Sequence, residues 1–391
     1  MIVELGLLAG VNYLINSFVN RDFNKFKKEF DNIIKTIPEL KNNQDEKINL
    51  INYESEDYGY TIKFMLPVGI SSEALKKHLL TIKQALKLSS THLKVDNRLI
   101  TLHAILNYDF KPYIPSKLPP NKILIAEFMN KDIIVDMNKF PHVLVCGDTG
   151  TGKSRVLFTI LTNLIYSSNR VSIYLLQVRK NDLVIFKNCK QVKSCSRTLE
   201  DVLQSLQEID EECQRREELL DIEKGYLNIE DYNKKSGKTL KYIYVVVEEF
   251  SFLNVSKGDS SEEKSLKHRC MMHLKNIVNA GRSSGVFLIT SLQKPTSDSI
   301  PTDIKAQLTT RVALNIKDAS TCRVVMSDDS AVNLGERELV CRTKDTVKGY
   351  SLTIDFPDIQ EHTKRWKIER KQERQKIKKD DAQDILKALG I

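Results

Sequence analysis

Residues 143–154 read V-L-V-C-G-D-T-G-T-G-K-S, a short apolar run followed by a glycine-rich turn that ends in Lys-Ser. The run predicts a buried strand, and the apolar residues at helical spacing that follow predict a helix. Glycines in such a turn allow backbone N–H groups to converge on phosphate oxygens, and the helix N-terminus adds partial positive charge. This strand–turn–helix pattern is typical of the phosphate-binding loop of a nucleoside triphosphatase.

The residues of this turn have predicted roles in holding ATP and Mg²⁺. Lys153 is expected to reach the β- and γ-phosphates, and Ser154 to ligate Mg²⁺. The alternative is a glycine-rich turn that binds no nucleotide. The predicted nucleotide-binding residues are Gly147, Asp148, Thr149, Gly150, Thr151, Gly152, Lys153 and Ser154.

A second apolar run ends in two acidic residues. Residues 243–249 read I-Y-V-V-V-E-E, which predicts a buried strand followed by Glu248 and Glu249. Because strands of such a fold place their carboxyl ends around one phosphate group, we expect Glu248 to hold the Mg²⁺ shell. Glu249 is expected to polarise the attacking water. Aspartate is common at the first position, and the longer glutamate favours a shifted or indirect metal contact. A solvated acidic pair at a strand end is the alternative.

Polar residues of two further predicted strands are candidates for the same site. Residues 286–295 (V-F-L-I-T-S-L-Q-K-P) predict a strand ending in Gln293, whose amide is placed to sense the γ-phosphate. Arg311 begins another predicted strand, and an exposed arginine there could reach across a subunit interface to stabilise transition-state charge. Arg282 is the rival for that role. A turn residue before Pro295 and an ordinary surface arginine are the alternatives.

Composition narrows the class of protein. The chain has 391 residues, 41% hydrophobic and 28% charged, which fits an ordinary soluble globular protein of two domains. Its net charge of +9 and pI of about 9.0 suggest an acidic partner, with nucleic acid or an anionic membrane surface as first candidates. The seven cysteines form no C-x-x-C pair and predict buried thiols in a reducing cytosol, with no structural metal.

Changes of pattern along the chain predict four parts. Residues 1–43 are expected to form an N-terminal helical segment, and residues 44–118 a small α/β domain ending in a proline-bearing linker. Residues 119–357 alternate strand and helix patterns, which predicts a mostly parallel sheet covered on both faces. Residues 358–391 are expected to form a charged helical tail that holds Trp366, the single tryptophan.

The N-terminal stretch Leu5–Val19 is apolar but contains Asn12 and Asn16, and it falls short of a clean membrane span. It lacks the positive start and the cleavage site of a secretory signal. Basic residues follow it, as at a cytoplasmic flank. We expect a cytoplasmic protein in which this stretch is a packed or partner-binding helix, or contacts the inner face of the cell membrane.

Taken together, these segments resemble the motor domain of the FtsK/SpoIIIE DNA translocases. Residues 245–250 (V-V-V-E-E-F) are similar to that family's V-V-I-D-E-F, and residues 281–295 (G-R-S-S-G-V-F-L-I-T-S-L-Q-K-P) to its G-R-A-A-G-I-H-L-I-x-A-T-Q-R-P. The resemblance covers about residues 119–357. Five stretches carry it in the family's order: Lys131–Ser154, Arg215–Asn233, Val245–Phe250, Gly281–Pro295 and Ile304–Ala313.

The resemblance implies a RecA-like P-loop ATPase domain, a homo-hexameric ring with ATP between neighbours, and DNA in the central pore. It also supports Arg311 as the residue that completes a neighbour's site. We expect no winged-helix DNA reader after residue 357, and a membrane domain that is absent or reduced to residues 1–19. Such a compact motor resembles the TcpA-like coupling proteins of Gram-positive conjugative plasmids and integrative elements. This implies a relaxase and membrane channel proteins as partners.

Contacts with DNA are expected to go to phosphates, and therefore to be sequence-tolerant and sensitive to salt. Candidate contacts are Lys257, Lys264, Lys267 and Arg269, and a solvated charged loop is the alternative. The basic tail Lys364–Lys379 is a further candidate for binding DNA, a relaxase or anionic lipid, or a solvated helix.

Two other functions stay open. An FtsK-like ATPase of a type VII protein secretion system would share every predicted site residue, although such motors generally carry several tandem ATPase modules. A nucleotide-gated DNA-binding adaptor is the third candidate, with Glu248 as the mark of a weakened catalytic site.

Overall fold

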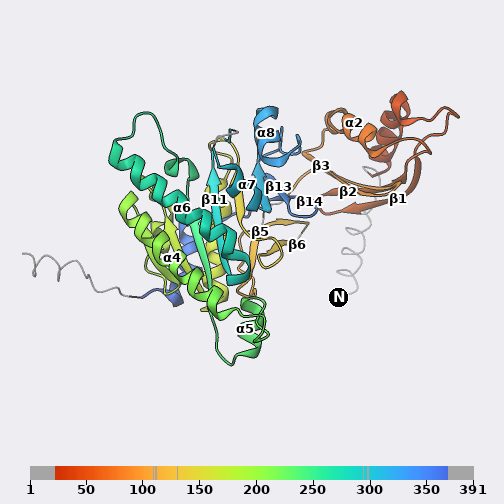
Figure 1. The fold of residues 1–391 in the computed structure, drawn as a ribbon. Helices are drawn as coiled ribbons and strands as arrows, with labels where there is room; N and C mark the ends of the chain where they lie inside the picture. The colour runs from red at the N-terminus through yellow and green to blue at the C-terminus, as the bar shows by residue number, and fades with distance from the viewer. Residues whose placement is uncertain are drawn as a thin grey trace, which may run out of the picture. The chain divides into compact units, whose positions relative to one another are not determined.

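The computed structural model describes residues 23–368, apart from residues 109, 111, 130, 294, 297 and 298. The chain divides after Phe110 into two compact units, which are described separately below (Figure 1). The predictions for residues 5–19 and for the tail beyond residue 368 lie outside the described residues. No helix in the described part is both long and apolar enough to cross a membrane.

Unit 1 is a four-stranded antiparallel sheet with packed helices. A helix at residues 23–36 precedes the sheet, and its Phe26, Phe30 and Ile34 are buried in the same apolar core as the strands. This helix therefore belongs to the small domain, which differs from the predicted boundary at residue 43. The other elements are a 3-10 turn η1 (Pro38–Leu40), β1 (Asn49–Glu56), β2 (Gly59–Met65), α2 (Ser72–Ala85), β3 (Ser90–Asp96) and β4 (Leu99–Ile105).

Unit 2 is built around a ten-stranded sheet. Its strands are β5 (Lys122–Phe128), β6 (Lys131–Asp136), β7 (Val143–Cys146), β8 (Val171–Leu176), β9 (Val192–Ser196), β10 (Tyr242–Val247), β11 (Val286–Leu292), β12 (Thr310–Leu314), β13 (Glu338–Arg342) and β14 (Thr346–Tyr350). Neighbouring strands pair in parallel through β12-β7-β11-β10-β8-β9. The remaining strands, in the order β6-β5-β14-β13, pair antiparallel and join the parallel half at β12. The predicted parallel sheet is confirmed, together with an antiparallel extension that the sequence patterns did not reveal.

Helices cover both faces of this sheet (Figure 1). They are α3 (Lys153–Ser167), α4 (Leu199–Leu219), α5 (Ile229–Lys235), α6 (Ser261–Ser284), α7 (Thr302–Gln307), α8 (Ala319–Met326) and α9 (Phe356–Thr363), with 3-10 turns η2 (Asp182–Phe186), η3 (Phe250–Leu253) and η4 (Lys364–Trp366). Helices α4 and α6 lie side by side and share an apolar core with Val245 of β10. Helices α3 and α9 share the other core with Tyr244. Both faces of β10 are therefore buried, which explains its uninterrupted apolar run.

The proline-bearing segment that we predicted as a linker packs within unit 2. Tyr113 is buried, and its hydroxyl donates to Asn163 Oδ1 of α3 at 3.2 Å, while the backbone N–H of Ser116 donates to the same oxygen at 2.9 Å. At the other end of unit 2, Trp366 packs partly buried against the core, and its carbonyl accepts from the N–H of Lys190. The division between the units therefore precedes the prolines.

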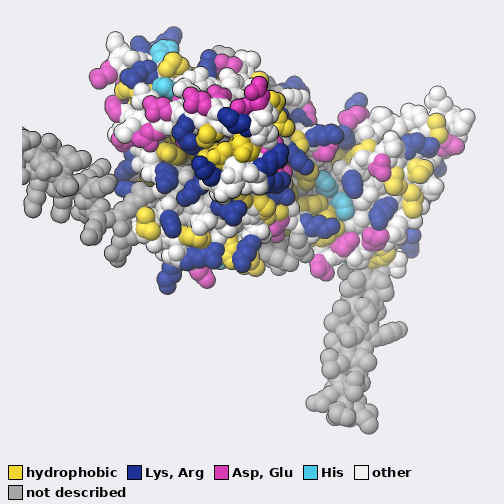
Figure 2. Space-filling view, turned by 60° about the horizontal axis from the view of Figure 1, so that its bottom comes forward, with side chains coloured by type: hydrophobic (Ala, Val, Ile, Leu, Met, Phe, Trp, Pro, Cys, Tyr) yellow, Lys and Arg dark blue, Asp and Glu magenta, His cyan; other side chains and the backbone are white. Residues whose placement is uncertain are grey.

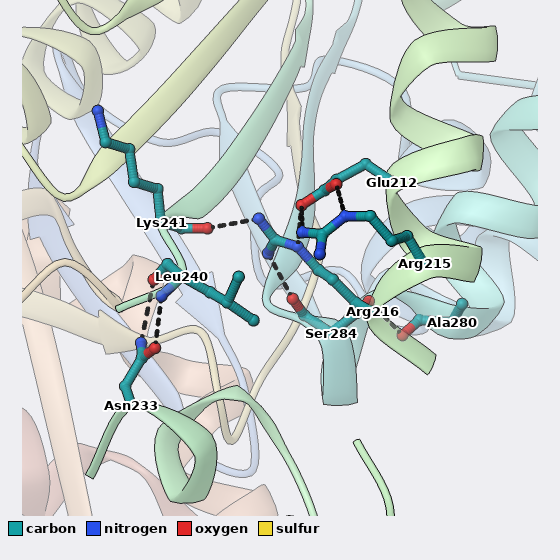
Figure 3. Close-up of polar contacts among 8 residues, drawn as sticks. All are labelled: Glu212, Arg215, Arg216, Asn233, Leu240, Lys241, Ala280 and Ser284. Atoms are coloured by element: carbon teal, nitrogen blue, oxygen red, sulfur yellow. Dashed lines mark hydrogen bonds and ion pairs between the residues drawn. The ribbon is translucent and has the colours of Figure 1, made fainter. Parts of the chain in front are cut away.

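The amino-terminal edge of the parallel strands is tied together by a buried arginine (Figure 3). Arg216 of α4 donates to the carbonyl oxygens of Ser284 at 2.7 Å and Lys241 at 2.9 Å, and to Glu212 Oε1 at 2.7 Å. Because Ser284 ends α6 and Lys241 precedes β10, one guanidinium joins a helix end to a strand start. In the stretch Arg215–Asn233, which resembles the translocase family, Arg216 near its start therefore has a structural role.

Candidate active site

The glycine-rich turn and the two acids lie at the same edge of the sheet. Cys146, the last residue of β7, pairs with Leu292 of β11, and Val247, the last residue of β10, pairs with Thr290 of β11. One strand therefore separates the strand that leads to the turn from the strand that leads to Glu248. The fold therefore places the turn and the two acids near each other, as predicted.

The turn after β7 has the positive φ angles that its glycines allow. Gly147, Gly150 and Gly152 have φ angles of 152°, 82° and 106°, a region that residues with a Cβ rarely adopt. A Cβ on Gly147 would lie 2.8 Å from Thr151 Oγ1, whereas one on Gly150 would meet open space. Gly152 leads directly into α3. The turn therefore fits the phosphates of a nucleotide, with backbone N–H groups and a helix N-terminus at the cradle.

Lys153 is buried at the base of this turn. Its Nζ donates to the carbonyl oxygens of Gly147 at 2.7 Å and Asp148 at 2.9 Å. Burial lowers the pKa of the ammonium, and the nearby Glu249 carboxylate opposes that shift. The two charged groups therefore lie near each other, and their predicted roles in one site stay a prediction.

A cavity of about 690 Å³ opens at the turn, and Lys153, Ser154 and Gln293 line it. Gln293 follows β11, and its backbone N–H lies 3.4 Å from Glu249 Oε1, which also accepts from Ser251 Oγ at 3.0 Å. The structure thus brings Gln293 to the acids, as the sequence predicted. Its role in sensing the γ-phosphate stays a prediction.

Glu248 carries the features of a site for a cation. Its carboxylate is buried, and Oε2 has no hydrogen-bond partner among the described residues. Burial, together with the nearby Asp182, raises the pKa of Glu248 to about 7. Ser154 Oγ donates to Asp182 Oδ2 at 3.3 Å. These oxygens are the donors that Mg²⁺ prefers, so the residues fit a magnesium ion held by Ser154, Glu248 and Asp182.

The sequence reasoning missed Asp182, together with three cations that line the cavity, Arg155, Lys180 and Arg337. One signal was present, because Asp182 is the single acidic residue between Asp148 and Glu200. It lies just after β8, at the same edge of the sheet as the turn.

The two arginines proposed as fingers lie away from this cavity. Arg311 is half-buried rather than exposed, because its guanidinium donates to the carbonyl oxygens of Val325 at 2.7 Å and Leu308 at 3.3 Å. Its expected exposure was wrong, while its action on a neighbouring subunit stays a prediction. Arg282 is near the end of α6, at the opposite edge of the sheet, where it donates to the carbonyl of Asn138 at 3.3 Å.

One of the candidate DNA contacts is engaged within the chain. Lys267 Nζ lies 2.8 Å from Asp259 Oδ2, and both side chains are only 11% exposed. Lys257 and Arg269 are exposed, and Lys264 is half-buried. Figure 2 shows Lys and Arg side chains spread over the surface that it presents, so charge alone does not single out one path for DNA.

Comparison with known proteins gives the family. The FtsK/SpoIIIE family model matches residues 117–329, more than half of the chain. The DNA translocase SftA of Bacillus subtilis is 26% identical over 227 residues, which are 56% of this chain and 23% of that protein. The DNA translocase FtsK of Helicobacter pylori is 24% identical over 245 residues, 61% of this chain and 28% of that protein. The chain thus spans about a quarter of the length of these curated relatives.

Solved structures share the fold. The pCW3 conjugation coupling protein TcpA, in monomer form with ATPγS, aligns with a TM-score of 0.61 and 20% identity over 88% of this chain and 99% of that chain. The type VII secretion ATPase EccC of Thermomonospora curvata aligns with a TM-score of 0.51 and 19% identity over 66% of this chain and 32% of that chain. EssC of Geobacillus thermodenitrificans aligns with a TM-score of 0.53 and 16% identity over 66% and 50%. With the family match and the site geometry, the chain belongs to the FtsK/SpoIIIE family, and unit 2 is its P-loop ATPase domain.

Proposed function

We propose that this chain is an ATP-driven DNA translocase that serves as the coupling protein in conjugative transfer of a plasmid or integrative element. The observation that carries the proposal is that Lys153 and Gln293 line one cavity, with Glu249 close to both, in a domain that matches a family of DNA translocases. The likeness to TcpA supports the finer assignment, because an alignment over 88% of the chain includes more than unit 2.

Bound ATP with Mg²⁺ supplies the phosphoanhydride bond whose hydrolysis drives the cycle. The turn Gly147–Gly152 holds the phosphates by its backbone N–H groups, and Lys153 offsets their charge. Glu249 accepts a proton from the attacking water, and Gln293, in contact with Glu249, responds to loss of the γ-phosphate. Arg311 completes the site of the next subunit in a homo-hexameric ring.

In this proposal DNA is held by its phosphates, with Lys257, Lys264 and Arg269 as contacts. A relaxase and membrane channel proteins are the partners expected of a coupling protein. The protein then works in the cytoplasm, at the inner face of the cell membrane.

Protein secretion is the second candidate, because EccC and EssC share the fold of unit 2. Their likeness favours this candidate less than that of TcpA favours conjugation. This chain covers 32% and 50% of those two structures, as expected for one module of a longer array, and 99% of the TcpA structure.

ATP hydrolysis by the full chain, measured with and without DNA, tests the proposal. We expect turnover that DNA stimulates and that the Lys153→Ala and Glu249→Gln variants lose. ATP turnover that does not change when DNA is added would favour a protein-secretion ATPase. Tight nucleotide binding without turnover would indicate a nucleotide-gated adaptor. Arg179→Gln is the control, since this exposed arginine does not line the cavity.

A further inference from the structure

The nucleotide cavity has a second wall that the glycine-rich turn does not supply. Residues 334–337, just before β13, line the cavity together with the turn residues Thr149–Ser154. This wall contains Arg337, a cation that no sequence pattern singled out. Two sets of contacts fix the wall to the turn.

The first set runs through Asn315, the residue after β12. Its backbone carbonyl accepts from the N–H of Asp148 in the turn at 3.1 Å, and its side-chain Oδ1 accepts from the N–H of Leu334 at 3.1 Å. Lys317 adds a contact, since its N–H donates to Asp148 Oδ2 at 3.2 Å. One residue therefore holds both walls at a fixed separation.

The second set runs through Ser351, which is buried after β14. Its N–H donates to the carbonyl of Arg337 at 2.8 Å, and its own carbonyl accepts from Arg337 Nη2. A Cβ built on Gly152 would lie 3.7 Å from Ser351 Oγ. Arg337 is therefore hydrogen-bonded to a residue whose side chain lies close to the last glycine of the turn.

The backbone of Arg337 is held in an unfavourable conformation. Its φ is 60°, a left-handed value that costs a residue with a Cβ about 1 kcal/mol and that glycine would adopt freely. Its guanidinium is fixed as well, because Nη1 donates to Thr353 Oγ1 at 2.6 Å. A side chain kept at a strained position and held in one orientation beside a cavity points to a ligand-binding role.

We propose that Arg337 binds a phosphate of the nucleotide held by the glycine-rich turn of the same chain. The inference rests on the proposed function, because it needs a nucleoside di- or triphosphate in this cavity. A planar guanidinium matches two phosphate oxygens at once, and its fixed orientation reduces the entropy lost on binding. Arg337 thus supplies a cation within the chain, in addition to any arginine from a neighbouring subunit.

Calorimetric titration of the full chain with ATPγS and Mg²⁺, and separately with ADP, tests this role. We expect Arg337→Gln to weaken both ligands about tenfold or more, since a charge-assisted contact is lost. Arg337→Lys should fall between that variant and the parent chain, because an ammonium keeps the charge without the planar fork. Arg179→Gln is the matched control, since Arg179 also has a positive φ, 57°, but does not line the cavity.

Arg337→Gly separates binding from folding. Glycine relieves the backbone at φ 60°, and it removes the same bonds to Ser351 and Thr353 as glutamine does. We therefore expect its ligand-free melting temperature to be equal to or higher than that of Arg337→Gln, while nucleotide affinity falls as in Arg337→Gln. Affinities within twofold of the parent in both variants would overturn the inference and leave the proposed function intact. Equal losses in all three variants, each with a lower ligand-free melting temperature, would also overturn it, because they indicate a damaged wall. A parent chain that binds neither nucleotide would refute the proposed function itself.

Discussion

Lys153 and Arg216 are both buried cations, 8% and 3% exposed, at opposite edges of the same parallel strands. Arg216 donates to a carboxylate and to two backbone carbonyls, one at the end of α6 and one just before β10. Lys153 donates to two carbonyls of its own turn, beside a cavity and next to acids. At one edge the fold supplies hydrogen-bond partners from other elements to the buried cation. At the other edge the buried cation lies next to an open cavity.

The carboxylates at the two edges show the same contrast. Burial alone would raise the pKa of Glu212, but hydrogen bonds from Arg215 and Arg216 bring it below its ordinary value. Burial and Asp182 raise the pKa of Glu248 to about 7, and one of its oxygens has no partner among the described residues. A carboxylate with complete partners stabilises the fold, whereas one with raised pKa and a bare oxygen marks a ligand site.

The strongest way to test this contrast is to remove Arg216. We expect Arg216→Ala to lower the free energy of unfolding of unit 2 by about 3–5 kcal/mol, because it leaves a partly buried carboxylate and two helix- and strand-end carbonyls without their donor. Urea titration followed by circular dichroism measures the change. Any protein that remains folded should keep its affinity for ATPγS, since the arginine lies at the other edge.

Arg215 offers a matched control, because it bonds the same Glu212 from an exposed position. Exposed ion pairs contribute little to stability, so Arg215→Ala should lower the free energy of unfolding by about 1 kcal/mol or less. If the two substitutions cost the same, the carbonyl contacts of Arg216 are not what holds this edge together.

Lys153→Ala should have the reverse pattern. We expect ATP hydrolysis to fall about a hundredfold or more, since one group that stabilises transition-state charge is lost. The ligand-free stability should change by no more than about 1 kcal/mol, because removal of a buried ammonium offsets the loss of two hydrogen bonds. Hydrolysis and thermal unfolding measured on one preparation decide this. A large loss of stability with intact hydrolysis would place Lys153 with Arg216 as a structural cation.

The sequence predicted what lies close along the chain and missed what the fold brings together. The turn 147–154 and the acids after β10 could be predicted because each is contiguous and follows an apolar strand. The exposure of Arg311 was misjudged because the carbonyl of Val325 comes from a helix that packs on β12. Asp182 and Arg337 reach the cavity from segments far from the turn, and no local pattern marks such contacts.

The antiparallel half of the large sheet and the exact bounds of the small domain could not be predicted for a similar reason. Edge strands such as β1 and β6 carry many exposed side chains and lack the continuous apolar run of β10. Proline residues near position 115 suggested a linker, yet Tyr113 is buried against α3. Tertiary contacts of that kind override local composition.

A third prediction concerns His142, which lies just before β7 at the structural edge. Its Nε2 donates to the carbonyl of Val278 at 3.0 Å, and its Nδ1 accepts from the N–H of Leu288 at 3.0 Å, so the ring is neutral. Burial lowers its pKa from 6.5 to about 4. Below pH 6.5 His142 is protonated in the unfolded chain but stays neutral in the folded chain. The free energy of unfolding therefore decreases as the pH falls from 6.5 towards 4.

This loss should amount to about 2–3 kcal/mol for His142 alone. Urea titrations of the parent chain and of His142→Gln at several pH values between 4 and 7 measure it. The variant is expected to be less stable near neutrality, because it loses two buried hydrogen bonds, but its stability should change less with pH. Parallel pH profiles for the two proteins would contradict the assignment.

The smallest expected effects concern the proposed DNA contacts, where engaged and exposed lysines can be compared directly. Lys257 is exposed, whereas Lys267 is held by Asp259 at 2.8 Å. We expect Lys257→Ala to weaken DNA binding about two- to threefold and to reduce the slope of log affinity against log salt by about one, because one phosphate contact is lost. Lys267→Ala should leave that slope unchanged, since its charge already has a partner. Fluorescence anisotropy with labelled duplex DNA at several salt concentrations distinguishes the two variants. If only Lys267→Ala changed the slope, the ion pair with Asp259 would have to open on binding, and the surface around α6 would need a different assignment.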